Sequence, residues 1–236
     1  MKEQNFYRQL TDVCHTFLLK EKPILDYLIN RNINKNIIKK YKLGYFPNDL
    51  RKLFEYISPK SLVDHQIIWS ANLSPFKNYP LVVPIRNVYG EEIAIGCRTL
   101  FSESDRKEKG IPKYRNSSYI KGAHLFGLDY AVNTIRNNDA VYITEGYFDV
   151  ISAQSQGIQN TVGTCGTALS VRQISMLSRY TNNINIIFDN DDAGKVAALR
   201  ALDKFKNKNI NIKIIQLPQE YKDLDEYITK TGMEII

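Results

Sequence analysis

From residue 139 onward, the sequence alternates between short β-rich runs and longer stretches of helical length. Four runs rich in Val, Ile and Thr are predicted to be strands: 140–144, 160–166, 184–189 and 210–218. The stretches between and after them are predicted to be helices: 148–155, 170–180, 193–206 and a short one at 226–230. Parallel strands require crossover connections, which are usually helical and right-handed. This alternation therefore predicts a parallel sheet covered by helices, and it restricts the possible folds more than any other feature.

The region upstream has a different pattern. Residues 5 to about 57 carry apolar residues at helical spacing, and Pro23 suits the first turn of a helix. Residues 79–100 contain two β-rich runs around a turn that ends at Gly90, which predicts a hairpin. Residues 101–122 are polar and lack periodicity, so we expect a loop there, and loops of this length are more often functional or mobile than idle.

These patterns together predict an α/β fold with two parts. A parallel sheet flanked by helices is expected over residues 139–236. A smaller α+β subdomain is expected over residues 1–138, with a helical start, a β-hairpin and a basic loop.

The composition excludes several classes of protein. With 43% hydrophobic residues, 15 Tyr and 10 Phe, the chain is too apolar to be disordered. Its three cysteines are scattered and form no Cys-x-x-Cys pair, which argues against a disulfide framework or a zinc cluster. No apolar run approaches the roughly 20 residues that cross a bilayer, and the N-terminal residues lack the apolar core of a secretory signal. We therefore expect a cytoplasmic protein without a membrane partner.

The net charge of +7 favours a polyanionic partner, although a modest excess of Lys also simply keeps a surface soluble. Basic residues are concentrated in two stretches. Residues 31–60 hold eight basic residues against two acidic ones, and residues 98–121 hold seven against three, with Tyr114 and Tyr119 between them. Either stretch could follow a phosphate backbone.

Acidic residues follow three of the predicted strands: Glu145 follows the first, Asp189 and Asp191 the third, and Asp223 and Asp225 the fourth. The carboxyl ends of the strands in an open parallel sheet meet at one crevice, where ligands bind. Carboxylates that lie together raise each other's pKa unless a cation compensates, and Mg²⁺ or Mn²⁺ prefers oxygen ligands. Two such ions can stabilise the attacking and leaving oxygens of a phosphoryl transfer, so the pattern predicts that chemistry.

Each acid taken alone also has a structural interpretation. Asp is strongly favoured at helix N-caps, so one of Asp189, Asp191 and Asp192 is expected to cap the helix that follows. Asp223 or Asp225 is expected to cap the last helix in the same way. For a single Asp, capping or solvation is the commoner role by roughly two to one. The combination of three acidic loops is what favours a metal site.

Four segments of the second half carry a specific pattern: VYITEGYFDVISAQSQGI, GTCGTALSVRQISMLSR, IIFDNDDAGKVAALRAL and LPQEYKDLDEYI. In this order and spacing they resemble the TOPRIM domain of bacterial DnaG-type primases, with its Glu-Gly-Tyr-x-Asp, Gly-Thr, Asp-x-Asp-x-Ala-Gly and late Asp-x-Asp motifs. Three upstream segments resemble the subdomain that precedes TOPRIM in the polymerase core of these primases: ILDYLINRNINKNIIKKYKLGYFP, YPLVVPIRNVYGEEIAIGCRTL and IPKYRNSSYIKGAHLFGLDYA. The resemblance covers nearly the whole chain.

The resemblance implies a DNA primase-like catalytic core, which makes short RNA primers on single-stranded DNA from ribonucleoside triphosphates. The reaction would be a nucleotidyl transfer with Mg²⁺ or Mn²⁺, two ions being expected. By motif, Glu145, Asp189 and Asp191 would be the principal metal ligands and catalytic residues. Asp223 and Asp225 would complete or support the site.

Other residues receive roles from the same resemblance. Asp149 would steady the site, and Gly146 and Gly194 would let the backbone pass close to metals or phosphates. Nucleotide or DNA contacts are assigned to Arg86, Arg98, Lys113, Tyr114, Asn116 and Lys121. Lys113 would also act in catalysis by neutralising the triphosphate. Arg86 suits a structural ion pair equally well.

The sequence departs from the family pattern in places. Asn190 stands where Gly is usual, and Asp192 where a basic residue is common; since Asn tolerates left-handed backbone, the turn is expected to survive. Primases of this kind usually also carry an N-terminal zinc domain and a C-terminal helicase-docking domain, which this sequence does not show. A replicative helicase or a separate zinc-containing protein is therefore a candidate partner. A phage, plasmid or other mobile element is a candidate source for such a compact core.

Two other functions stay open at this level. A TOPRIM nuclease uses the same Glu and Asp-x-Asp set to cut phosphodiesters with Mg²⁺, but the KYRNS and IKG segments are expected of a primase core. A non-catalytic module that binds DNA or the replication machinery is the other alternative, and the retained carboxylates argue against it.

Overall fold

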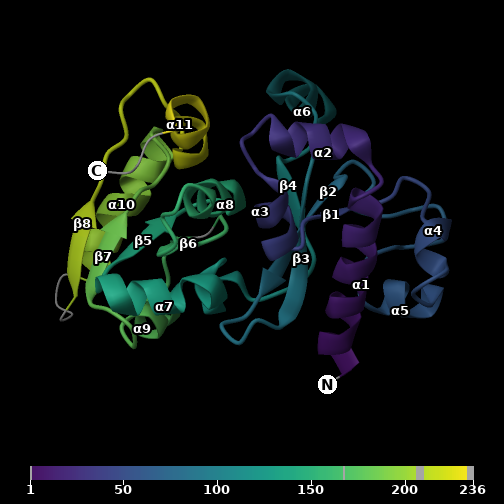
Figure 1. Cartoon of the computed structure of the whole chain (residues 1–236), viewed down its shortest axis with the longest axis horizontal. Coiled ribbons are helices and arrows are strands. Elements are labelled where there is room, and N and C mark those ends of the chain that lie inside the picture. Colours follow the sequence, from purple (N-terminus) through teal and green to yellow (C-terminus); the bar gives the residue numbers. More distant parts are fainter. Residues whose placement is uncertain (1, 167, 206–209, 233–236) are drawn as a thin grey trace. The chain divides into compact units, whose positions relative to one another are not determined.

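Two compact units make up the chain in this computed structural model (Figure 1). The first unit comprises Met1–Arg86 and Glu91–Tyr119, and the second comprises Asn87–Gly90 and Ile120–Ile236. The structure describes residues 2–166, 168–205 and 210–232, with side chains from residue 6 onward.

An antiparallel sheet with strand order β1-β2-β3-β4 forms the centre of the first unit. Its strands are β1 (Gly44–Tyr45), β2 (Leu81–Arg86), β3 (Glu92–Arg98) and β4 (Tyr114–Asn116). Strands β2 and β3 form the predicted hairpin, in which Val83 lies opposite Gly96. Gly90 in the connecting turn has a φ of 81°, a conformation that favours glycine.

Helices surround this sheet, and most of them lie in the region predicted to be helical. They are α1 (Lys2–Leu18), α2 (Lys22–Ile29), α3 (Lys35–Lys40), α4 (Arg51–Phe54), α5 (Pro59–Asp64) and α6 (Glu103–Lys109). Helix α1 packs its apolar side against the sheet through Leu10 and Cys14, in a buried cluster with Phe46 and Ile95. A side chain on Gly44 would place its Cβ 2.7 Å from that of Cys14, so β1 can approach α1 this closely only with glycine.

The prediction of an unstructured loop over residues 101–122 was wrong. Helix α6 begins after Ser102, whose Oγ accepts a hydrogen bond from the N–H of Asp105. It ends at Gly110, which has left-handed backbone. Both caps were readable from the sequence, as a Ser three residues before an acid and a Gly after the last turn. Strand β4 also lies in this range, because its backbone pairs with β3 whatever its polar composition.

The second unit is built on the predicted parallel sheet, whose strand order is β6-β5-β7-β8. Its strands are β5 (Val141–Thr144), β6 (Thr161–Gly163), β7 (Asn183–Ile186) and β8 (Asn211–Ile214). Its helices are η1 (Lys121–Ala123), α7 (Leu128–Asn138), α8 (Tyr147–Ser155), α9 (Val171–Leu177), α10 (Asp192–Phe205) and α11 (Leu224–Thr231). The predicted alternation of strands and helices is confirmed. Residue 206, where one helix was predicted to end, lies outside the described residues.

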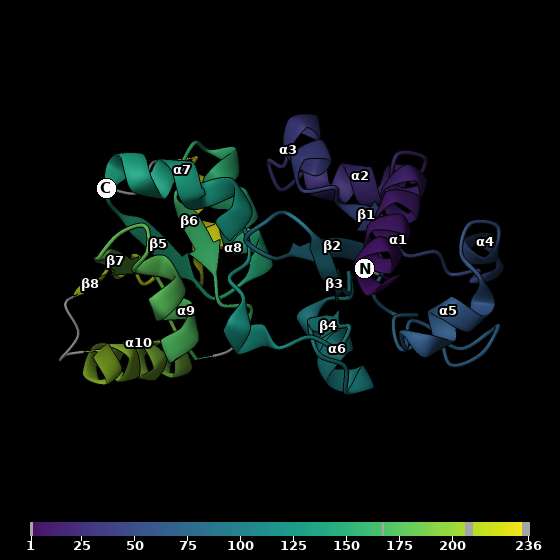
Figure 2. The same ribbon diagram turned by 90° about the horizontal axis from the view of Figure 1, so that it is seen from below.

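Side chains alternate along these strands between two apolar clusters, one on each face of the sheet. Ile143 and Ile186 pack in a cluster with α7, α9 and α10. Tyr142 and Ile187 pack in a cluster with α8 and α11. The fold is therefore a parallel sheet with helices on both faces, as predicted, and Figure 2 shows its helices from a second direction.

The strand order places a topological switch point between β5 and β7. Helix α8, which follows β5, leads to β6 on one side, and α10, which follows β7, leads to β8 on the other. These two helices cover opposite faces of the sheet. In open α/β sheets, ligands bind at the carboxyl ends of the strands at such a switch point. Glu145 follows β5, and Asp189 lies in the turn after β7.

The compact units divide at a different place from the expected ranges 1–138 and 139–236. Leu128, Ala131 and Ile135 on α7 pack against the parallel sheet, so this helix belongs to the second unit. Val88, in the turn of the hairpin, packs against the same cluster.

Candidate functional site

Glu145 lies directly after β5, at the switch point of the sheet. Its Oε1 accepts a hydrogen bond of 3.2 Å from the backbone N–H of Asp189, which joins the ends of β5 and β7. Burial raises the pKa of Glu145, and the charge of Asp191 raises it further against the lowering effect of that hydrogen bond. A cation at this point would relieve the repulsion.

The turn from β7 into α10 carries Asp189 and Asp191. Asp191 caps α10, because its Oδ1 accepts a hydrogen bond of 2.8 Å from the N–H of Gly194. Of the three acids considered for this cap, Asp191 is therefore the one that fills it. A side chain on Gly194 would place its Cβ 2.9 Å from the carbonyl carbon of Asp189 and closer still to its oxygen. Gly194 therefore lets the start of α10 pass against the backbone of Asp189.

Asp149 lies buried in the first turn of α8 and links two of the acidic loops. Its Oδ2 accepts a hydrogen bond from the N–H of Gly146, and its Oδ1 accepts one of 3.0 Å from the N–H of Asp225. Burial raises the pKa of Asp149 to about 8, and the charges of Asp223, Asp225 and Asp189 add to this effect. These two hydrogen bonds join the start of α8 to the loop that carries Asp223 and Asp225.

Asp223 and Asp225 lie at the start of α11. Asp223 is its N-cap and accepts a hydrogen bond of 2.8 Å from the N–H of Glu226. Asp225 is only 3% exposed, and its Oδ1 accepts a hydrogen bond of 2.6 Å from the hydroxyl of Ser152. The predicted cap of the last helix is therefore Asp223, while Asp225 is bound to α8.

Some of these acids interact electrostatically, and Asp149 takes part in most of the pairs. Glu145 lies within electrostatic range of Asp191, and Asp149 within range of Asp189, Asp223 and Asp225. Such a set of oxygen donors suits a hard divalent cation. In the parts of the chain that the structure describes, however, no group of three or more His, Cys, Asp or Glu side chains is arranged to hold a metal ion. The donor chemistry fits Mg²⁺ or Mn²⁺, and the carboxylates would have to turn toward a shared ion.

Arg98, at the end of β3 in the first unit, is only 8% exposed. Its guanidinium lies 5.4 Å from the ring centre of Tyr114 and 5.9 Å from that of Tyr27, and it donates a hydrogen bond of 2.7 Å to the Tyr114 hydroxyl. Arg31 approaches the Tyr27 ring at 5.6 Å, and Lys113 approaches the Tyr114 ring at 5.8 Å. Cations therefore alternate with aromatic rings in this largely buried cluster.

Sequence reasoning missed Tyr27, which lies beside Arg98, and Arg31, which lies beside Tyr27. Tyr27 is a half-buried residue of α2, and Arg31 follows that helix. Their four-residue spacing, which places both side chains on one side of a helical turn, was the available signal.

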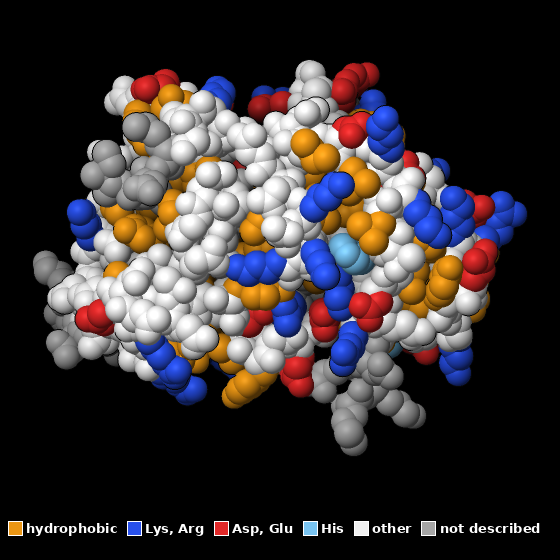
Figure 3. Space-filling view, viewed as in Figure 1, with side chains coloured by type: hydrophobic (Ala, Val, Ile, Leu, Met, Phe, Trp, Pro, Cys, Tyr) orange, Lys and Arg blue, Asp and Glu red, His pale blue; other side chains and the backbone are white. Residues whose placement is uncertain are grey.

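The other residues proposed for nucleotide or DNA contact lie at several places. Asn116 lies on β4, opposite Gly96 of β3. Arg86 is the last residue of β2, in the first unit. Lys121 lies in the second unit, in η1. The turn that carries Lys121 is bound to α9 through the fully buried Gln173. The amide of Gln173 donates hydrogen bonds to the carbonyl of Lys121 at 3.4 Å and to the carbonyl of His124 at 2.7 Å. On the face drawn in Figure 3, Lys and Arg side chains gather over the first unit, with Asp and Glu between them.

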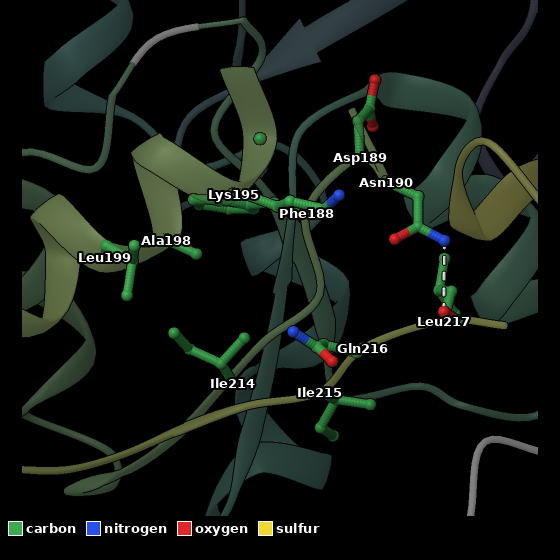
Figure 4. A pocket seen from close by; sticks show the side chains of 11 residues that line it. Phe188, Asp189, Asn190, Lys195, Ala198, Leu199, Ile214, Ile215, Gln216 and Leu217 are labelled. Atoms are coloured by element: carbon green, nitrogen blue, oxygen red, sulfur yellow. Dashed lines mark hydrogen bonds between the residues drawn. The ribbon is translucent and has the colours of Figure 1, made fainter. Parts of the chain in front are cut away.

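A cavity of about 210 Å³ lies beside Asp189, between the start of α10 and the segment that follows β8 (Figure 4). Phe188, Ala198 and Ile214 give it apolar walls. It is smaller than the roughly 300 Å³ at which pockets begin to hold a drug-sized ligand. Asn190 lies at its rim, with its amide nitrogen directed toward Leu217.

Two sequence families match the chain. Residues 14–132 match the family described as DNA primase catalytic core, N-terminal domain, and residues 142–228 match a family described as Toprim-like. The first match ends at residue 132 and the second begins at residue 142, whereas the compact units divide between residues 119 and 120.

Curated DNA primases match most of this chain. Those of Clostridium acetobutylicum and Aquifex aeolicus are 36% and 31% identical to it over 218 and 247 aligned positions. The matches cover 88% and 99% of this chain but 35% and 48% of the relatives. The chain thus spans less than half the length of these proteins.

Solved structures agree with the fold. The crystal structure of the zinc binding and RNA polymerase domains of the Aquifex aeolicus primase is 31% identical, with a TM-score of 0.80, covering 96% of this chain and 58% of that one. The structure of a DnaG primase catalytic domain bound to ssDNA is 25% identical, with a TM-score of 0.81, covering 98% of this chain and 77% of that one.

Proposed function

This chain belongs to the DNA primase catalytic core family, and from that premise we propose that it synthesises short RNA primers on single-stranded DNA. The observation that carries the proposal is the position of Glu145 and Asp189 at the switch point of the parallel sheet, joined by a hydrogen bond. Asp191 interacts electrostatically with Glu145, and Asp149 interacts with Asp189.

The proposed site would hold Mg²⁺ or Mn²⁺. Glu145, Asp189 and Asp191 would be its principal ligands, and Asp223 and Asp225 would complete or support it. When bound, such ions would offset the negative charge that develops as a hydroxyl attacks the α-phosphorus of a ribonucleoside triphosphate and pyrophosphate leaves.

The protein's own side chains would mainly position the reactants and balance their charge. Because Glu145 has a raised pKa without a metal, it is a carboxylate whose ionisation a cation would promote. Gly194 keeps the backbone of Asp189 against the start of α10, and the cap formed by Asp191 fixes that helix. These contacts would hold the acids in place while charge develops on the phosphate.

Template and nucleotide would be bound by the cationic and aromatic residues. Lys113 and Lys121 would contact phosphates, and Tyr114, fixed by Arg98, would offer a ring edge or face to a base. Asn116 and Arg86 are proposed to contribute to the same binding. A replicative helicase or a separate zinc-containing protein would be its protein partner. The protein would act in the cytoplasm. No helix in the described residues is long and apolar enough to cross a membrane.

Primer synthesis on a single-stranded template with ribonucleotides and Mg²⁺ or Mn²⁺ tests the proposal. We expect short RNA products that require both template and metal, and a loss of about 100- to 1,000-fold in Glu145→Gln or Asp189→Asn, because each removes a charge from the proposed metal site. Asp203→Asn is the matched control, because it removes an exposed carboxylate on α10. Degraded template without RNA would instead indicate a nuclease, and DNA retention without turnover would indicate a binding module.

A further inference from the structure

Asn190, between the two acids of the Asp-x-Asp motif, makes four hydrogen bonds to a loop far away in the sequence. Its amide nitrogen lies within 3.1 Å of the carbonyl oxygens of Leu217, Pro218 and Tyr221. Its backbone N–H donates a hydrogen bond of 2.7 Å to the carbonyl of Lys222. An amide nitrogen has two hydrogens, so at least one of them is shared between two carbonyls. Figure 4 shows this side chain directed at Leu217.

The bound segment, residues 216–222, is the one that leads into Asp223 and Asp225. Two further hydrogen bonds of this segment are local: the N–H of Tyr221 donates to the carbonyl of Pro218, and the N–H of Lys222 donates to Glu226 at the start of α11. Among the described residues, Asn190 therefore donates hydrogen bonds that join this segment to the turn after β7.

The backbone does not explain why Asn stands at this position. The φ angle of Asn190 is not positive, so this residue does not adopt the left-handed conformation that we expected. The backbone here therefore does not require the Gly that is usual in the family. Its amide, by contrast, has several acceptors at hydrogen-bonding distance. The side chain rather than the conformation is what the fold uses.

We propose that Asn190 is a positioning residue that joins the loop carrying Asp223 and Asp225 to the turn carrying Asp189 and Asp191, so that both acidic loops can serve the same divalent cations. This inference rests on the proposed function. Residues that orient metal ligands without touching the metal typically change metal affinity 10–100-fold when they are removed.

Binding of Mn²⁺ in the absence of DNA and nucleotides tests this role. The electron paramagnetic resonance signal of the free ion measures that binding. We expect Asn190→Ala to weaken Mn²⁺ binding about 10-fold. In primer synthesis, the Mn²⁺ concentration for half-maximal rate should rise, while the rate at saturating Mn²⁺ recovers. Asn190→Gly, which restores the family's usual residue, should show the same loss, and it provides a second variant should the first fail to fold.

Asn160→Ala is the matched control. The amide of Asn160 donates a 2.9 Å hydrogen bond to the carbonyl of Ala140, at the opposite ends of the strands, so its loss should lower stability without changing Mn²⁺ affinity. Equal Mn²⁺ affinity in the parent and in Asn190→Ala would overturn the inference, as would equal weakening by Asn160→Ala. A parent protein that binds no Mn²⁺ would instead contradict the proposed function.

Discussion

At the scale of single residues, Gly194 is the position where the smallest change should disturb the site. Ala usually stabilises a helix by up to about 1 kcal/mol relative to Gly. Here its Cβ would collide with the backbone of Asp189, which cannot rotate away as a side chain can. We expect Gly194→Ala to lower the free energy of unfolding by about 2 kcal/mol, measured by urea denaturation. Gly122→Ala, whose Cβ would lie 3.5 Å from Ser170, should be close to neutral, and an equal loss there would contradict this explanation.

Asp149 should make stability depend on pH. In the unfolded chain its carboxyl ionises near pH 3.8, whereas in the folded protein it keeps its proton to about pH 8. Between these values the folded state binds more protons, so the metal-free protein should lose up to about 1.4 kcal/mol of stability per pH unit as pH rises. Above pH 8 this loss should stop. Urea denaturation in a chelating buffer measures it.

Asp149→Asn gives the comparison for that pH dependence. Asn keeps one carbonyl oxygen that can accept a hydrogen bond from Gly146 or Asp225, but it does not ionise. Its stability should therefore fall less steeply between pH 4 and pH 8 than that of the parent. Parallel curves for the two proteins would show that Asp149 does not carry the effect.

At the scale of elements, the first turn of α10 combines a structural and a proposed catalytic role in Asp191. Asp191→Ala removes the cap and should cost about 1 kcal/mol of stability, whereas Asn is an equally good cap. We expect the free energy of unfolding of Asp191→Asn to lie within a few tenths of a kcal/mol of the parent value. Its Mn²⁺ binding should nevertheless be as weak as that of Asp191→Ala. Thermal denaturation together with Mn²⁺ titration separates the two roles. Full Mn²⁺ affinity in Asp191→Asn would leave Asp191 as a cap only.

The elements also show what could be predicted from the sequence. The parallel sheet was predictable because short β-rich runs alternate with stretches of helical length. Glu145 and Asp189 were predictable as neighbours because they follow parallel strands, whose carboxyl ends lie at one edge of the sheet. Helix α6 was missed because its polar residues have no apolar side, although its caps were visible. The amide of Asn190 could not be predicted, since its acceptors are carbonyls about 30 positions away whose place depends on the completed fold.

At the scale of the whole molecule, the proposed metal ligands and most of the residues proposed to contact DNA lie on different units, Lys121 on the second unit being the exception. The carboxylates all lie on the second unit, while Arg98, Lys113 and Tyr114 lie on the first. Loss of metal binding and loss of DNA binding should therefore be separable by substitution. Variants of the acids should still retain single-stranded DNA, and variants of the cations should still bind Mn²⁺.

The salt dependence of DNA binding measures the second task. Each phosphate contact with a single strand contributes about 0.7 to the slope of log affinity against log salt concentration, because a bound counterion is released. We expect Lys113→Ala to weaken binding of a single-stranded oligonucleotide and to reduce this slope by about 0.7. Arg179→Ala, which removes an exposed cation just beyond α9, is the matched control and should leave the slope unchanged. Fluorescence anisotropy at several salt concentrations gives both values. An unchanged slope in Lys113→Ala would mean that Lys113 does not contact a template phosphate, whatever its effect on catalysis.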